Sequence, residues 1–120
     1  MFRNNHSLIK SFLSAFRGIK HALGERNFFI QVVIGSLAIT LAFILELSFV
    51  ERAVIIVFSV LVLVVEIINT AFEKLLDKII KEENPEIAKI KELMAAAVLI
   101  FSAAAFLIGL WIFGRAIFFR

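Results

Sequence analysis

Four polar side chains recur at helical spacing in a stretch of the chain that is otherwise apolar. They are Glu66, Asn69, Glu73 and Asp77. At about 100° per residue around a helix, Glu73 lies about 20° to one side of Glu66 and Asp77 about 20° to the other. Asn69 lies about 60° from Glu66, so all four share one face. Carboxylates this close repel one another, and a bound divalent cation or protonation of one partner would relieve the repulsion.

Glu66 interrupts an apolar run that reads as part of a membrane span. A carboxylate inside a bilayer costs about 2.5–3.5 kcal/mol on insertion scales, so it marks a candidate functional site. The structural alternative is that Glu66 pairs with a lysine, or joins Asn69 in hydrogen bonds between helices. Because four polar residues line one face, running from inside the bilayer to the cytoplasmic surface, we interpret that face as functional.

Two further residues lie where apolar runs meet the expected cytoplasmic surface. Glu25 precedes the first run, and its depth should match that of Glu73 at the end of the second. Two glutamates at one level on adjacent helices suit a hard cation, although an acid at a helix start is also favoured by the macrodipole alone. Lys91 opens the third run and would attract phosphate as a point charge, or serve only as an anchor at the membrane surface.

Three long apolar runs must position these residues. The first has 18 residues without a formal charge, and the third has 22. Since a span needs about 20 residues, both qualify, and the second run qualifies if Glu66 is tolerated inside it. We therefore predict one membrane domain, 1–120, with spans at 28–50, 53–73 and 93–114.

The N-terminal segment, 1–24, predicts an amphipathic helix that lies in the membrane interface. Its apolar residues recur at helical spacing: Leu8, Phe12, Phe16, Ile19 and Leu23. Lys10 and Arg17 take the other side, so the helix is too charged to span a bilayer. The expected fold class is an all-α membrane protein, with this interfacial helix and three transmembrane helices.

Composition excludes several other classes of protein. Of 120 residues, 62% are apolar and 19% are charged, so one small core could not hide the apolar surface from water. Cysteine is absent, which excludes disulfide scaffolds, thiol catalysis and cysteine-based zinc sites. The net charge of +3 is too small to indicate a nucleic-acid partner.

The distribution of Lys and Arg predicts the orientation in the membrane. Residues 1–27 hold five and residues 73–92 hold five, whereas the remaining three are Arg52, Arg115 and Arg120. The positive-inside rule then places the N-terminus in the cytoplasm and the C-terminus outside. Ala95, Ser102 and Gly109 recur every seven residues in the third run, and such small residues permit close contact between helices or between subunits.

These motifs resemble the bacterial integral-membrane diacylglycerol kinase and undecaprenol kinase family. The second-span hallmark of that family, Glu-x-x-Asn-Ser/Thr-Ala-x-Glu, is complete from Glu66 to Glu73. The Glu-Arg-Asn-Phe entry to the first span begins at Glu25, and Lys91 keeps the family's spacing of fourteen residues from Asp77. The resemblance covers nearly the whole chain and implies a multi-pass protein of the bacterial inner membrane, assembled as a homotrimer.

The resemblance also implies a role for each matching residue. Glu66 would be the catalytic base, supported by Asn69, and Glu25 with Glu73 would hold the Mg²⁺ of MgATP. The expected nucleotide contacts are Asp77, Glu82, Glu83, Asn84, Lys91 and Glu92, and the expected lipid contacts are Lys10, Glu66 and Ala95. Glu92 replaces the family's aspartate and Asn84 its histidine, so nucleotide preference is the property most open to change.

The sequence leaves several functions open. The first is an ATP-dependent kinase of a membrane lipid alcohol, either diacylglycerol or undecaprenol, with the Glu25 and Asn84 motifs closer to the undecaprenol branch. The second is a small proton-coupled transporter that uses Glu66, which would not explain the carboxylates and lysine at one membrane surface. The third is a membrane scaffold without catalysis, which leaves the polar face unexplained.

Overall fold

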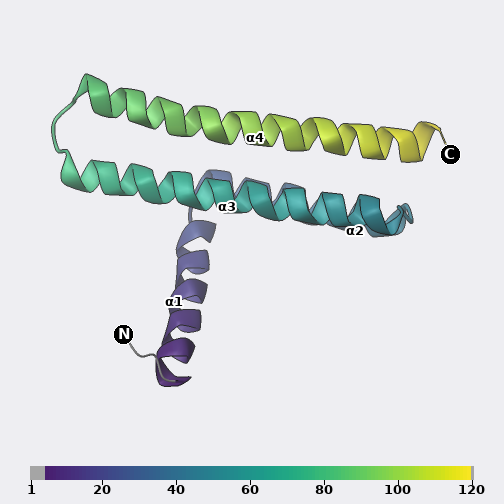
Figure 1. Cartoon of the computed structure of the whole chain (residues 1–120), viewed down its shortest axis with the longest axis horizontal. Coiled ribbons are helices and arrows are strands. Elements are labelled where there is room, and N and C mark those ends of the chain that lie inside the picture. The colour runs from purple at the N-terminus through teal and green to yellow at the C-terminus, as the bar shows by residue number, and fades with distance from the viewer. Residues whose placement is uncertain (1–4, 120) are drawn as a thin grey trace.

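The computed structural model describes residues 5–119, which form four helices and no strand. These helices are α1 (Asn5–Leu23), α2 (Arg26–Ile44), α3 (Phe49–Ile79) and α4 (Pro85–Phe118). Figure 1 shows α3 and α4 side by side as a hairpin, with α2 behind α3 and α1 projecting away from the other three. Because α3 contacts both α2 and α4, it is the central helix of the chain.

The prediction of an all-α protein with three spans is confirmed. By length and composition, α2, α3 and α4 can each cross a membrane. With 31 residues, α3 is about 46 Å long, which exceeds the hydrocarbon core of about 30 Å. One end of α3 therefore extends beyond the apolar part of a bilayer, and the same holds for α4, with 34 residues.

The turn between α2 and α3 is earlier than the predicted 28–50 span allows. Helix α2 ends at Ile44, and Glu46 takes a φ of 53°, in the left-handed region. Ser48 then begins α3 through a capping box, in which its hydroxyl accepts from the Glu51 N–H and Glu51 accepts from the Ser48 N–H. Phe49 and Val50 therefore belong to α3, because the uncharged run already ends before Glu46 and the capping box begins a new helix at Ser48. Residues 1–4 of the predicted 1–24 helix, and Arg120, lie outside the described residues.

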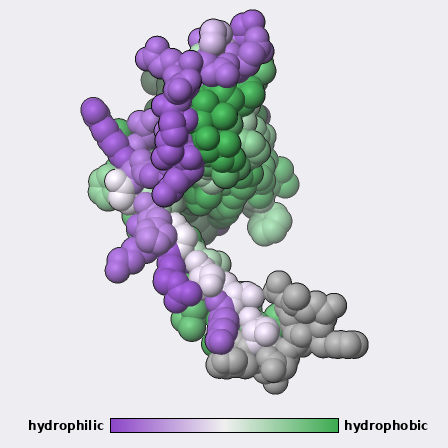
Figure 2. Space-filling view, turned by 90° about the vertical axis from the view of Figure 1, so that its left-hand side faces the viewer, coloured by the Kyte–Doolittle hydropathy of each residue, from purple (hydrophilic) through white to green (hydrophobic). Residues whose placement is uncertain are grey.

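The turn between α3 and α4 is set by an asparagine and the chain's one proline. The side chain of Asn84 accepts a hydrogen bond from the Glu86 N–H at 2.8 Å, and Pro85 occupies the first turn of α4. Proline suits that position because its missing N–H would have no partner within the helix. This turn carries polar residues, which Figure 2 shows gathered at the end of the hairpin, with apolar residues along the side behind them.

The small core lies at the opposite end of the hairpin. It joins Ala42, Leu47, Ile55 and Ile112, which come from α2, the turn after it, α3 and α4. Most other large apolar side chains point outward, and the chain exposes 9420 Å². A soluble protein of 13.5 kDa would expose about 6,500 Å². The excess is apolar surface that lipid or other subunits must cover.

Ala42 generates a test of this core, because it is fully buried. We expect Ala42→Leu to destabilise the folded chain by about 1–3 kcal/mol through overpacking. Ala104→Leu is the matched control, since Ala104 is exposed on α4. Thermal unfolding in detergent micelles measures both, and equal unfolding midpoints for the two variants would contradict this packing.

Candidate active site

The polar face of α3 runs from a buried end to an exposed end. Glu66 is 5% exposed and Asn69 is 9% exposed, which makes them the only buried polar residues among those described. Glu73 is half-buried, and the side chain of Asp77 is 65% exposed. A single helix therefore carries a carboxylate held in apolar surroundings and, about 16 Å along its axis, a carboxylate in water.

Asn69 connects the buried end of this face to Glu73. Its Nδ2 donates to Oε1 of Glu73 at 3.4 Å, and its Oδ1 is buried without a hydrogen-bond partner. A buried acceptor left in this state costs about 1–3 kcal/mol. An unpaired amide oxygen close to a carboxylate is the kind of oxygen ligand or acceptor that a hard cation or a hydroxyl would use. The oxygen atoms of Asn69 and Glu73 are therefore ligands of the type that the predicted Mg²⁺ requires.

Glu25 lies immediately before α2 and reaches across to α3. It occupies the N-cap position, yet its side chain makes no capping hydrogen bond. Instead, its Oε1 forms an ion pair with Nζ of Lys74 at 3.0 Å. Since Lys74 directly follows Glu73, this ion pair places Glu25 beside that level of α3. Lys74 was not among the residues predicted from the sequence, although it lies next to Glu73 and therefore at nearly the same depth as Glu25.

Within residues 5–119, no group of three or more His, Cys, Asp or Glu side chains comes close enough to hold a metal ion. This does not exclude the predicted pair of glutamates, because Mg²⁺ in kinases is commonly held by one or two carboxylates together with substrate phosphates. The structure thus brings Glu25 to the level of Glu73, and the assignment of the two as Mg²⁺ ligands stays a prediction.

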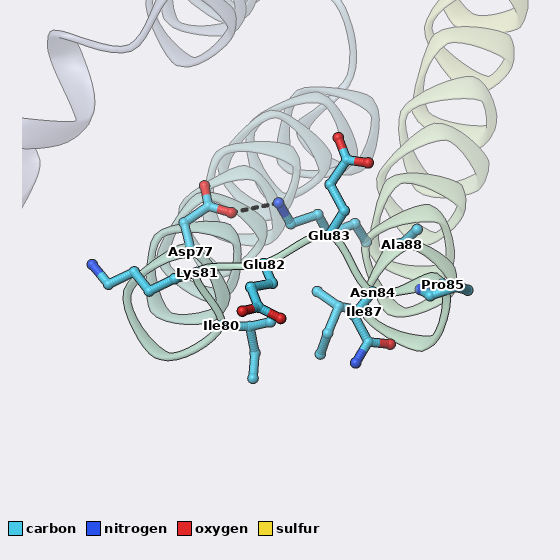
Figure 3. A pocket seen from close by; sticks show the side chains of 10 residues that line it. Asp77, Ile80, Lys81, Glu82, Glu83, Asn84, Pro85, Ile87 and Ala88 are labelled. Atoms are coloured by element: carbon cyan, nitrogen blue, oxygen red, sulfur yellow. Dashed lines mark hydrogen bonds and ion pairs between the residues drawn. The ribbon is translucent and has the colours of Figure 1, made fainter.

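A pocket of ≈600 Å³ lies where α3 turns into α4 (Figure 3). We call it the polar pocket, because charged and amide side chains line it together with a few apolar ones. It is lined by Asp77, Ile80, Lys81, Glu82, Glu83, Asn84, Pro85, Ile87, Ala88 and Lys91. Nζ of Lys91 on α4 pairs with Oδ1 of Asp77 on α3 at 2.5 Å, drawn as the dashed line in Figure 3. Five of the six predicted nucleotide residues therefore line one pocket, and Glu92 is not among the lining residues.

Two predicted lipid contacts lie apart from this pocket. Lys10 is exposed on α1, and Ala95 is exposed on α4, one turn beyond Lys91. A second pocket of ≈500 Å³, which was not predicted from the sequence, lies between α2, α3 and α4 and is mostly apolar. It includes Val62, which lies one helical turn from Glu66 on α3, so the buried carboxylate and the apolar pocket are neighbours along the helix.

Comparison with known proteins shows which family the chain is similar to. The family model described as prokaryotic diacylglycerol kinase matches residues 13–113. A diacylglycerol kinase of Synechocystis sp. is 37% identical over 105 residues, which cover 86% of this chain and 60% of that protein. An undecaprenol kinase of Bacillus subtilis is 34% identical over 105 residues, covering 87% of this chain and 85% of that protein.

A third relative, a diacylglycerol kinase of Pseudomonas aeruginosa, is 35% identical over 89 residues, covering 74% of this chain and 68% of that protein. The chain thus spans about three fifths of the Synechocystis relative and over two thirds of the other two. Together with the three apolar helices, these matches identify a bacterial membrane protein. The chain belongs to the prokaryotic diacylglycerol kinase family, a family of membrane lipid kinases, which confirms the resemblance seen in its motifs.

A substitution of Asn69 can distinguish a functional role of this residue from a structural one, because its side-chain oxygen has no hydrogen-bond partner. We expect Asn69→Leu, which removes that oxygen together with the long Nδ2 hydrogen bond to Glu73 and keeps a similar volume, to unfold at an equal or higher temperature while lipid phosphorylation falls at least tenfold. Thermal unfolding and a phosphorylation assay on the same micelle preparation measure the two effects. A clear loss of stability, with activity retained, would instead assign Asn69 to structural hydrogen bonding.

Proposed function

We propose that the protein transfers the γ-phosphate of ATP to the hydroxyl of a membrane lipid alcohol. The observation that carries this proposal is the buried Glu66 on the same helix as the polar pocket at Asp77. A base inside the apolar layer can reach a lipid hydroxyl whose tails stay in the bilayer, while the nucleotide stays in water. Phosphoryl transfer requires mainly this kind of positioning, together with neutralisation of phosphate charge.

In this proposal Glu66 accepts the proton of the lipid hydroxyl, the hydroxyl oxygen attacks the γ-phosphorus, and ADP leaves. Asn69 supports Glu66, and a hydroxyl or cation that reaches its free Oδ1 removes an existing desolvation cost. Mg²⁺ held by Glu25 and Glu73, together with the ATP phosphates, would neutralise negative charge. The lipid would also contact Lys10 and Ala95.

The nucleotide would occupy the polar pocket at the turn between α3 and α4. Lys91 would contact the phosphates, and the other proposed contacts are Asp77, Glu82, Glu83, Asn84 and Glu92. Lys91 is paired with Asp77 in the free protein, and the two side chains are 38% and 65% exposed. An exposed ion pair contributes about 0–1 kcal/mol, so ATP phosphates can compete for the lysine.

The proposal also includes how the chain sits in the membrane and assembles. In this proposal the chain lies in the inner membrane, with the N-terminus and the polar pocket in the cytoplasm and the C-terminus outside. The distribution of Lys and Arg supports this orientation. Helix α1 exposes Leu8, Phe12 and Phe16, so it would lie in the interface with these residues in lipid. A homotrimer would cover more of the exposed faces of α3 and α4, and would bring a second chain next to each polar face.

The proposed reaction is tested with purified protein in detergent micelles, supplied with MgATP and either diacylglycerol or undecaprenol. We expect ATP-dependent phosphorylation of one or both lipids. Glu66→Gln keeps the size of the side chain and removes the base, so the rate should fall about 10²- to 10⁴-fold. Glu46→Gln, the same change at the outer turn, should leave the rate within twofold.

Two results would reject this function. Absence of lipid phosphorylation by the wild-type protein, in preparations that bind nucleotide, would reject the kinase itself. Near-normal turnover by Glu66→Gln would reject Glu66 as the base. The identity of the phosphorylated lipid decides whether the substrate is diacylglycerol or undecaprenol, the two lipids for which the relatives are named.

A further prediction concerns whether the proposed site is shared between two subunits. If Glu25 of one chain serves Glu66 of another, mixing inactive Glu66→Gln chains with inactive Glu25→Gln chains should restore a measurable fraction of activity. The two variants are unfolded, mixed and refolded in micelles, and a tag on one variant reports whether mixed oligomers form. Mixed oligomers with activity at the parental level would assign both residues to a site within one chain.

A further inference from the structure

The ion pair between Glu25 and Lys74 places a positive charge on the proposed metal site. Nζ of Lys74 lies 3.0 Å from Oε1 of Glu25, and the pair joins the start of α2 to α3. Lys74 also directly follows Glu73, the second glutamate assigned to Mg²⁺. An ammonium group therefore already occupies one of the two carboxylates on which the proposed metal site depends.

We propose that Lys74 competes with a divalent cation for the Glu25 carboxylate and thereby sets the metal concentration that the site requires. The inference rests on the proposed function, because it takes Glu25 as a metal ligand. Mg²⁺ binds oxygen directly at about 2.0–2.1 Å and demands near-ideal geometry. An ammonium held against the same carboxylate would lie within a few Å of the metal and repel it, so the lysine must move away as the metal binds.

The exposure of the pair indicates that this displacement is easy. The side chains of Lys74 and Glu25 are 68% and 40% exposed, and pairs of this kind contribute about 0–1 kcal/mol. The competition should therefore change metal affinity by a few-fold, enough to set a threshold without preventing metal binding. Glu25 makes no capping hydrogen bond to α2, so its carboxylate is free to exchange the lysine for a metal.

Lys78 provides a matched control on the same helix. It lies one turn beyond Lys74 and is exposed, and no ion pair involves it within the described part of the chain. Lys74→Gln and Lys78→Gln remove the same charge from nearly the same place. A general effect of net charge on metal binding would appear in both variants, whereas competition for Glu25 would appear only in the first.

The test measures Mn²⁺, a paramagnetic probe for the metal site, by electron paramagnetic resonance of the free ion. The full-length protein in micelles is titrated with Mn²⁺ alone and with Mn²⁺ plus a non-hydrolysable ATP analogue. We expect Lys74→Gln to tighten Mn²⁺ binding about two- to fivefold. Lys78→Gln should change the Mn²⁺ affinity by less than half of the change seen in Lys74→Gln. In a protein that also carries Glu25→Gln, Lys74→Gln should not tighten Mn²⁺ binding.

The sign of the effect distinguishes competition from a structural role. If the ion pair served only to hold α2 against α3, its loss would loosen the site and weaken Mn²⁺ binding. Unchanged or weaker binding in Lys74→Gln, equal tightening in Lys78→Gln, or tightening that persists without Glu25 would each overturn the inference.

Lipid phosphorylation is measured separately. Mn²⁺ binding in the expected pattern, without lipid phosphorylation, would reject the kinase and keep the competition. Lipid phosphorylation with unaltered Mn²⁺ affinity in Lys74→Gln would reject the competition and keep the kinase.

Discussion

The burial of one carboxylate and one amide in a chain with almost no core is the constraint on which the rest of the structure depends. Glu66 and Asn69 must be kept away from lipid, because an exposed polar group in the hydrocarbon costs several kcal/mol. Among the three candidate spans, α3 is the one that packs against both of the others, α2 and α4. The polar face therefore lies on α3, and the two helices beside it, with any further subunits, provide the enclosure.

The length of α3 then decides how the site is divided between lipid and water. A helix of about 46 Å in an apolar layer of about 30 Å has residues in both phases. Glu66 follows the apolar stretch of α3, and Asp77 lines the pocket at the polar turn. Both phases are thus connected by one rigid element, and groups on a helix keep their spacing more accurately than groups on loops. The distance between Glu66, the proposed base, and the pocket proposed for the nucleotide is fixed by helical geometry rather than by folding of the turn.

The sequence predicted the elements and the polar face well, because both depend on local periodicity. The spacing of Glu66, Asn69, Glu73 and Asp77 along one helix is enough to place them together, and the apolar runs are long enough to identify the spans. The predicted 28–50 span continued past Glu46, although the uncharged run ends at Leu45, one residue beyond the end of α2. The capping box of Ser48 and Glu51 shows why Phe49 and Val50 start α3 instead of ending α2. The partners of Glu25 and Lys91 were not predictable, because contacts between helices depend on the relative rotation of the helices, which a single sequence does not encode locally.

The interactions of the site differ in strength according to what each has to do. The ion pairs of Glu25 with Lys74 and of Asp77 with Lys91 are exposed and join different helices, so each can be exchanged at a cost below about 1 kcal/mol. The unpaired oxygen of Asn69 is buried, and its cost of about 1–3 kcal/mol persists until a ligand supplies a partner. The side chains proposed to bind the metal and the nucleotide, Glu25 and Lys91, are therefore held only by weak ion pairs. The side-chain oxygen of Asn69, near the proposed base, has no hydrogen-bond partner. Binding of the proposed substrates would therefore replace a few weak side-chain partners and supply the one that Asn69 lacks.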